Sequence, residues 1–119
     1  MSKITEFKER DIREHPEVKR YYDQAELNLQ TEVFIYEVCE IIGLTVKDFA
    51  KFAEIRPSLI EHIKDSTIDV SYELLEHMAR NLKINLGPKK FSCLKNSKLL
   101  QKEKQTTNEV FKRFLDTYI

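Results

Sequence analysis

The chain has 119 residues, which is the length of one domain and leaves little room for a second independent core. Hydrophobic residues make up 41% and charged residues 34%, and the presence of only two glycines and three prolines argues against a turn-rich all-β fold. The net charge is zero, no apolar run approaches the roughly 20 residues that span a bilayer, and the N-terminus is too charged for a signal peptide. We therefore expect a cytoplasmic protein with no membrane segment.

The first part of the chain predicts two helices. After a charged leader, Pro16 stands where a first helical turn tolerates proline, and the apolar residues that follow predict a helix over about 16 to 28. A second apolar segment runs from Glu32 to Ile42 with helical spacing. It stops before Gly43, and glycine is typical just past a helix C-terminus.

Three more helices are predicted before residue 87. Thr45 and Asp48 have the spacing of a capping box at the start of the first, and Pro57 begins a short second helix. In that second helix we expect Ile60 and Ile63 to face inward. Ser71 is the predicted cap of the third. Residues 16 to 86 thus predict an all-α fold, a five-helix bundle.

The C-terminal part divides into a basic stretch and a helix. Residues 88 to 105 hold six lysines against one glutamate, whereas residues 30 to 87 hold ten acidic and six basic residues. The basic stretch is either a solvated linker or an arm that contacts phosphates. Thr106 and Glu109 have capping-box spacing ahead of an amphipathic helix at about 107 to 118. We therefore divide the chain into a charged leader with an N-terminal helix (1–29), a central domain (30–87), a basic linker (88–105) and a C-terminal amphipathic helix (106–119).

The C-terminal helix also predicts an assembly. An isolated helix of about a dozen residues is marginal in water, so its apolar residues should be buried against the domain or against a second copy. Of these two we favour dimerisation. The residues concerned are Phe111, Phe114, Leu115 and Tyr118.

Two short helices with a tight corner between them lie in residues 43 to 64. Such a corner needs a small residue where the helices cross, which is Ala50, and apolar residues at fixed offsets, such as Phe49 and Ile60. These residues, together with Gly43-Leu44-Thr45, Ile55, Ser58 and Ile63, resemble the helix-turn-helix of the phage-repressor (Cro/CI, or Xre) family. The resemblance covers roughly half of the chain. It implies a homodimer that binds double-stranded operator DNA through Thr45, Lys47, Arg56, Ser58, Leu59, Glu61, His62 and Lys64.

The preceding segment, with Pro16-Glu17-Val18 and Tyr21-Tyr22, is similar to HigA-type antitoxins, a branch of that family that neutralises a cytoplasmic ribonuclease toxin. The resemblance implies a cognate toxin as a second partner. The apolar residues of the predicted first helix either pack on the core or bind that partner: Val18, Tyr21 and Tyr22.

Three positions depart from the family pattern. Glu54 stands where the turn usually has glycine, so a residue other than glycine has to adopt a left-handed conformation or the turn is reshaped. Val46 replaces a glutamine that usually touches phosphate, and Glu61 lies in the helix expected to read bases. An acid there is repelled by phosphates unless it accepts a hydrogen bond from a cytosine amino group.

Catalytic and metal-binding chemistry lack a candidate set of residues. The three histidines match no zinc spacing, and the nucleotide-binding and nucleophile-elbow motifs are missing, so we expect neither an enzyme nor a metal or other cofactor. Cys39 is interpreted as core and Cys93 as a loop thiol. Two functions remain open: a sequence-specific DNA-binding repressor that could also be an antitoxin, and a protein-interaction module with weak or lost DNA binding.

Overall fold

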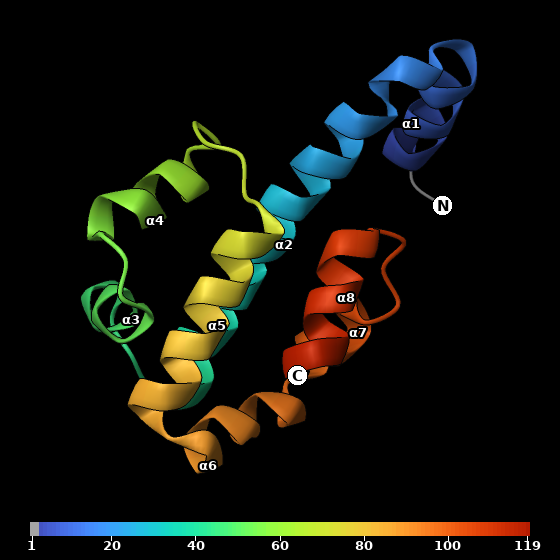
Figure 1. Cartoon of the computed structure of the whole chain (residues 1–119). Helices are drawn as coiled ribbons and strands as arrows, with labels where there is room; N and C mark the ends of the chain where they lie inside the picture. The colour runs from blue at the N-terminus through green and yellow to red at the C-terminus, as the bar shows by residue number, and fades with distance from the viewer. Residues whose placement is uncertain (1–2) are drawn as a thin grey trace.

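The chain is all-helical in the computed structural model, which describes the backbone of residues 3–119 and side chains from Lys8 onward (Figure 1). No strand occurs within that described part, which confirms the predicted all-α class. The elements are α1 (Lys3–Glu14), the short 3-10 helix η1 (Pro16–Val18), α2 (Lys19–Ile42), α3 (Val46–Ala53), α4 (Pro57–Lys64), α5 (Tyr72–Leu86), α6 (Pro88–Phe91), a second 3-10 helix η2 (Ser92–Asn96), α7 (Lys98–Glu103) and α8 (Glu109–Tyr118).

One long helix replaces the two that the sequence predicted over 16 to 28 and 32 to 42. Helix α2 runs without a break for 24 residues, so residues 16 to 86 hold four α-helices and not five. The segment between the two predicted helices contains no glycine or proline, and its Gln30 and Thr31 are buried. The Thr31 hydroxyl donates to the Leu27 carbonyl at 2.8 Å within the helix. As predicted, α2 ends at Gly43, whose φ of 82° is left-handed.

The core surrounds Phe34 in the middle of α2. The Phe34 ring meets Phe49 of α3 edge-on, with ring centroids 6.5 Å apart, and Phe114 of α8 with centroids 5.1 Å apart. Helices from the start, middle and end of the chain therefore share one core. Its fully buried large side chains are Phe34, Phe49, Phe111, Phe114, Ile60, Ile63, Leu75, Met78, Leu82, Leu94, Leu100 and Leu115.

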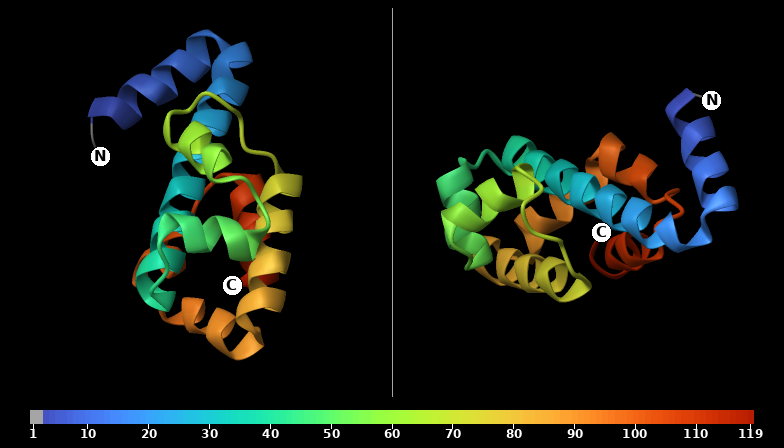
Figure 2. Two further views of the ribbon diagram at one scale, coloured as in Figure 1. Left: turned by 90° about the vertical axis from the view of Figure 1, so that its left-hand side faces the viewer. Right: turned by 90° about the horizontal axis from the view of Figure 1, so that it is seen from above.

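The N-terminal segment forms helix α1 where the sequence predicted only a charged leader. It projects from the body of the molecule and turns back beside the start of α2 (Figures 1 and 2). Two polar contacts join them: Lys8 pairs with Glu26 at 3.0 Å, and the Tyr22 hydroxyl donates to Asp11 at 2.5 Å. These contacts are made by the polar groups of half-buried side chains, so hydrophobic periodicity gave no signal for the docking of α1.

Residues 88–105 are not a linker. They fold into α6, η2 and α7, which bury Phe91, Leu94 and Leu100 while the lysines between them stay largely at the surface. The buried Ser97 accepts the Leu100 amide at 3.1 Å and donates to Glu37 of α2 at 2.9 Å. The stretch is thereby attached to the long helix.

The predicted C-terminal helix is present as α8, but its cap differs from the prediction. The side chain of Asn108, not that of Thr106, accepts the amide of the third helical residue, Phe111, at 3.1 Å. The Thr106 hydroxyl instead donates to Glu26 at 2.8 Å and accepts from Gln30 at 2.7 Å. These bonds hold the start of α8 against α2.

No helix in the described part of the chain is long and apolar enough to cross a membrane.

Candidate nucleic-acid interface

Helices α3 and α4 form a compact pair at one side of the molecule (Figures 1 and 2). Each has eight residues, and Glu54, Ile55 and Arg56 connect them. The inward residues predicted from the sequence, Ile60 and Ile63, are fully buried, and Ala50 is 1% exposed. The pair is therefore fixed to the core by its apolar side.

The start of α3 has the predicted capping box. The Thr45 hydroxyl accepts the Asp48 amide at 3.1 Å, and the Asp48 carboxylate accepts the Thr45 amide at 3.4 Å. These bonds engage two backbone N–H groups and place an acid in the first turn of α3, next to Lys47 at the surface.

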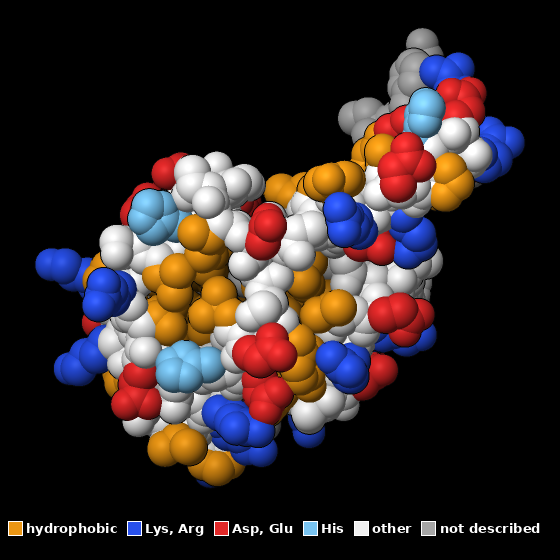
Figure 3. Space-filling view, turned by 45° about the horizontal axis from the view of Figure 1, so that its top comes forward, with side chains coloured by type: hydrophobic (Ala, Val, Ile, Leu, Met, Phe, Trp, Pro, Cys, Tyr) orange, Lys and Arg blue, Asp and Glu red, His pale blue; other side chains and the backbone are white. Residues whose placement is uncertain are grey.

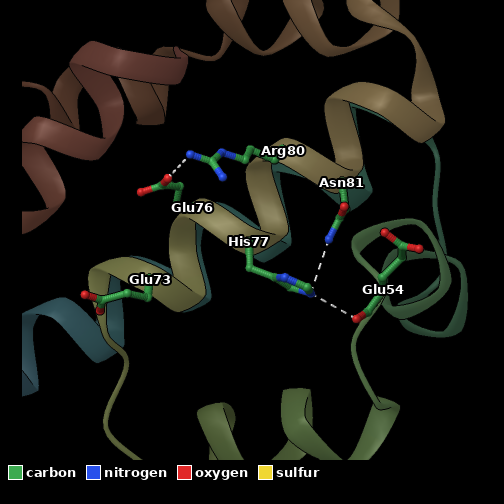
Figure 4. Close-up of a pocket in the computed structure, with 6 residues that line it drawn as sticks. All are labelled: Glu54, Glu73, Glu76, His77, Arg80 and Asn81. Atoms are coloured by element: carbon green, nitrogen blue, oxygen red, sulfur yellow. Dashed lines mark hydrogen bonds and ion pairs between the residues drawn. The ribbon is translucent and has the colours of Figure 1, made fainter.

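The turn between the two helices has a glutamate in the left-handed region, which is the first of the two outcomes expected from the sequence. Glu54 adopts φ 56° and ψ 48°, which is the left-handed conformation expected of this position. Opposite it, His77 and Asn81 on α5 lie one helical turn apart. The His77 ring nitrogen Nε2 is 3.1 Å from the Glu54 carbonyl oxygen and 3.2 Å from the Asn81 side-chain nitrogen (Figure 4). Asn81 also donates to the Ala53 carbonyl at 3.3 Å.

The outer side of α4 is polar and open. Arg56, Ser58 and Glu61 are exposed, and although Arg56 is the N-cap residue of α4, its side chain makes no capping hydrogen bond. His62 is also exposed, but its Nδ1 lies 2.9 Å from the hydroxyl of Thr67. Of its two ring nitrogens, Nε2 is therefore the one left to reach a ligand.

Leu59 differs from the other predicted DNA-binding residues because it is half-buried. With Ile55 and Leu74 it lines a groove between α4 and α5, and His62 and His77 also border this groove. The space-filling view shows hydrophobic side chains at the floor of this hollow with a histidine on either side (Figure 3). Leu59 therefore faces the groove more than the outer side of α4.

The charges of this pair are balanced. Every charged side chain between residues 45 and 65 is exposed, and the four basic ones are matched by four acidic ones. The basic set is Lys47, Lys51, Arg56 and Lys64; the acidic set is Asp48, Glu54, Glu61 and Asp65. The surface thus has no excess positive charge to attract phosphates.

The three residues predicted to bind a partner protein differ in how exposed they are in the structure. Tyr21 is 63% exposed, whereas Tyr22 is half-buried beneath α1 and the half-buried Val18 lies in η1. The hydrogen bond to Asp11 raises the pKa of the Tyr22 hydroxyl. Tyr22 is therefore already engaged within its own chain.

The residues predicted to form a dimer lie in the chain's own core. Phe111, Phe114 and Leu115 have no exposed surface, and Tyr118 is half-buried with its ring 5.5 Å from that of Phe114. Of the two predicted modes of burial, the structure has the one against the domain. A dimer contact would have to use other residues.

One feature of the candidate interface was missed by the sequence analysis, namely the row of His77, Asn81 and Asn85 on α5 that meets the end of α3. The four-residue spacing of these polar side chains was available as a signal, but nothing indicated that the end of α3 lies opposite them.

The described residues contain no cluster of three or more His, Cys, Asp or Glu side chains able to hold a metal. Burial raises the pKa of the Cys39 thiol, which is partly enclosed by the core, while Cys93 is exposed.

No protein-family model, curated protein or solved structure shows a significant match to the chain.

Proposed function

We propose that the chain is a sequence-specific DNA-binding regulator, in which α4 enters the major groove and the N-terminal end of α3 lies against the phosphate backbone. The observation that carries this proposal is the two-sided character of α4. Ile60 and Ile63 are fully buried on one side, while Arg56, Ser58 and Glu61 are exposed on the other. A short helix held rigidly by its apolar side, with polar side chains facing outward, is what base recognition in the major groove requires.

The polar residues of α4 suit particular bases. Arg56 can donate two hydrogen bonds to the O6 and N7 atoms of guanine, and Glu61 can accept one from the amino group of cytosine. Because the surface of α3 and α4 has no excess positive charge, unspecific attraction to phosphates is weak. Discrimination between sequences then depends mainly on these base contacts.

The proposal is tested by selecting duplexes from a random library with the full chain at about 0.1 M salt, where long-range attraction is already screened. We expect one sequence family to be enriched. Arg56→Ala should reduce the preference for that family by about 1–3 kcal/mol, and Glu61→Gln should change the preferred base at one position.

Two matched variants serve as controls. Lys112→Ala and Glu109→Gln, both on α8, make the same kinds of change at exposed positions away from α4, and both should leave the preference unchanged. Failure to enrich any sequence, or equal losses in the α4 variants and their controls, would reject base recognition by α4.

A further inference from the structure

An uncovered apolar side runs along α2. Three of the six exposed large hydrophobic side chains in the described part of the chain lie on it: Tyr21, Leu29 and Tyr36 are 63%, 60% and 59% exposed. With the exposed Ala25 and the half-buried Val33 they form what we call the α2 stripe (Tyr21, Ala25, Leu29, Val33, Tyr36). Successive members are three or four residues apart, so they share one side of the helix.

Helix α1 does not cover this stripe. Among the described side chains, Asp11 and Lys8 of α1 contact Tyr22 and Glu26 beside the N-terminal end of the stripe, and Tyr21 stays 63% exposed. The C-terminal part of the chain does not cover it either, because Leu29 lines two separate surface hollows. One hollow lies toward Lys102 and Thr106 of the C-terminal segment, and the other lies toward Asp69 of the loop before α5.

The stripe is nearly symmetric about Leu29. Ala25 lies four residues before it and Val33 four residues after it, while Tyr21 precedes it by eight and Tyr36 follows it by seven. If a second copy of α2 crosses the first antiparallel at Leu29, Ala25 of each copy lies opposite Val33 of the other. Tyr21 then lies near the other copy's Tyr36. Such a self-complementary patch is what a two-fold symmetric contact requires.

The charges of α2 indicate the same orientation. The helix begins with Lys19 and Arg20 and carries Glu40 in its last turn, the reverse of the arrangement that its own dipole favours. From residue 31 to 43 it contains three glutamates and no base. The two bases are the first two residues of α2, ahead of Asp23 and Glu26, and an antiparallel copy would place them beside the acidic end of the other helix, whereas a parallel copy would place like charges together.

Arg20 is positioned for this contact. Its guanidinium lies over the Tyr21 ring, 5.3 Å from the ring centroid, and so at the edge of the α2 stripe. Lys19 is instead paired with Asp23 at 2.7 Å, and this hydrogen bond raises the pKa of the lysine. Arg20 is therefore the basic residue expected to meet the acidic end of a second copy.

We propose that two copies of this chain associate antiparallel through the α2 stripe, centred on Leu29. The stripe uses no residue of α3 or α4, so this inference does not rest on DNA binding.

Sedimentation of the full chain over concentrations from about 1 µM to about 1 mM tests the association. We expect a dimer that Leu29→Lys weakens by at least about tenfold. Leu99→Lys on α7 is the matched control, since Leu99 is also apolar and 48% exposed, and it should leave the dimer intact. Both variants should keep the unfolding transition of the parent. A monomeric parent chain, or equal weakening by both variants, would overturn the proposal.

Charge exchange tests the orientation. Arg20→Glu alone and Glu40→Lys alone should each weaken the dimer. The two substitutions in one chain should restore it, because position 20 of each copy is then acidic and faces a basic position 40 of the other copy. In a parallel dimer the combined variant would bring like charges together and would not recover. The absence of recovery would therefore overturn the antiparallel arrangement.

Cross-linking gives an independent reading of the orientation. With Cys39 and Cys93 replaced by alanine, Ala25→Cys chains mixed with Val33→Cys chains should form mixed disulfides under mild oxidation. Cross-linking of Ala25→Cys chains with one another in preference to the mixed product would contradict the antiparallel contact.

Discussion

Asn85 donates a 2.7 Å hydrogen bond from its side-chain amide to the carbonyl oxygen of Phe52, and so joins the last turn of α5 to the last turn of α3. Asn81 and His77 continue the row at intervals of four residues along α5, reaching the carbonyls of Ala53 and Glu54. Carbonyls at a helix C-terminus have no partner within the helix. Helix α5 therefore supplies hydrogen-bond partners where α3 ends.

The first prediction follows from this row. Asn85→Ala should lower the free energy of unfolding by about 0.5–1.5 kcal/mol, the net value of a hydrogen bond of this kind. Urea denaturation measures the change. Lys83→Ala on the same helix is the control, because Lys83 is exposed and its replacement should fall within about 0.5 kcal/mol of the parent. Equal effects of the two substitutions would show that the hydrogen bond from Asn85 to the Phe52 carbonyl does not contribute to the free energy of unfolding.

The second prediction concerns the turn itself. Glu54 holds a left-handed backbone, which costs a residue other than glycine about 1–2 kcal/mol, so Glu54→Gly should raise the free energy of unfolding by up to about 1 kcal/mol. Glu61→Gly removes the same side chain from an ordinary helical position and should lower stability by about 1 kcal/mol. Thermal unfolding of both variants measures the contrast. A loss of stability in Glu54→Gly would mean that the glutamate side chain contributes more than its backbone costs.

The sequence predicted the α3–α4 unit well because its signals are local. A capping box is readable at Thr45 and Asp48, a helix start at Pro57, and an inward side at Ile60 and Ile63, and all of these are present in the structure. Each depends on residues within four positions of one another. The partners of the turn were not readable, because Glu54 and His77 are 23 positions apart and only the fold brings them together.

The third prediction concerns the C-terminal helix. Phe114 is fully buried against Phe34, so Phe114→Ala should cost about 3–5 kcal/mol. Ile84→Ala, at a side chain that is 75% exposed, should cost well under half as much.

A chain ending at Gln105 loses three fully buried side chains, Phe111, Phe114 and Leu115, and should not unfold cooperatively in calorimetry. A cooperative transition in the shortened chain would show that α8 is dispensable to the core.

The basic stretch was misread as a linker for a physical reason. Its buried side chains, Phe91, Leu94 and Leu100, are separated by lysines and fall on two short helices and a 3-10 turn, so no single period describes them. Likewise, α2 was read as two helices because it carries apolar residues on two sides: Leu27, Phe34 and Val38 are buried in the core, whereas Tyr21, Leu29 and Tyr36 are exposed. A helix with apolar residues on two sides shows no single amphipathic period that would mark it as continuous.

The fourth prediction is a pH dependence at the contact of α1 with α2. Because its hydrogen bond to Asp11 raises the pKa of Tyr22 above the unfolded value of about 10, the folded state favours the protonated hydroxyl. The contribution of this hydrogen bond to the free energy of unfolding is fully present below about pH 10. It is lost as the pH rises through the pKa that Tyr22 has in the folded state. Urea denaturation of the parent and of Tyr22→Phe should therefore differ near neutral pH and converge only as the pH rises past the raised, folded-state pKa.

Tyr21→Phe provides the comparison for this experiment, since it removes a neighbouring hydroxyl from an exposed side chain. The gap between the parent and Tyr21→Phe should not close as the pH rises. If the gap for Tyr22→Phe also stays constant, the hydrogen bond to Asp11 does not stabilise the docked α1.

The last prediction separates the lysines of the proposed DNA surface from those of the basic stretch. Lys47 and Lys51 lie on α3, whereas Lys98 and Lys102 lie on α7, on the far side of α2 and α5 in two perpendicular views (Figures 1 and 2). Each lysine that neutralises a phosphate adds about 0.9 to the slope of log affinity against log salt concentration. Changing Lys47 and Lys51 together to glutamine should therefore flatten the salt dependence of DNA binding by about 1 to 2 units of slope. The same change at Lys98 and Lys102 removes equal charge from the opposite side, so it should leave the slope close to that of the parent. A salt titration with the selected duplex compares the three proteins, and a larger effect from the α7 pair would place the phosphate contacts on the C-terminal stretch and not on α3.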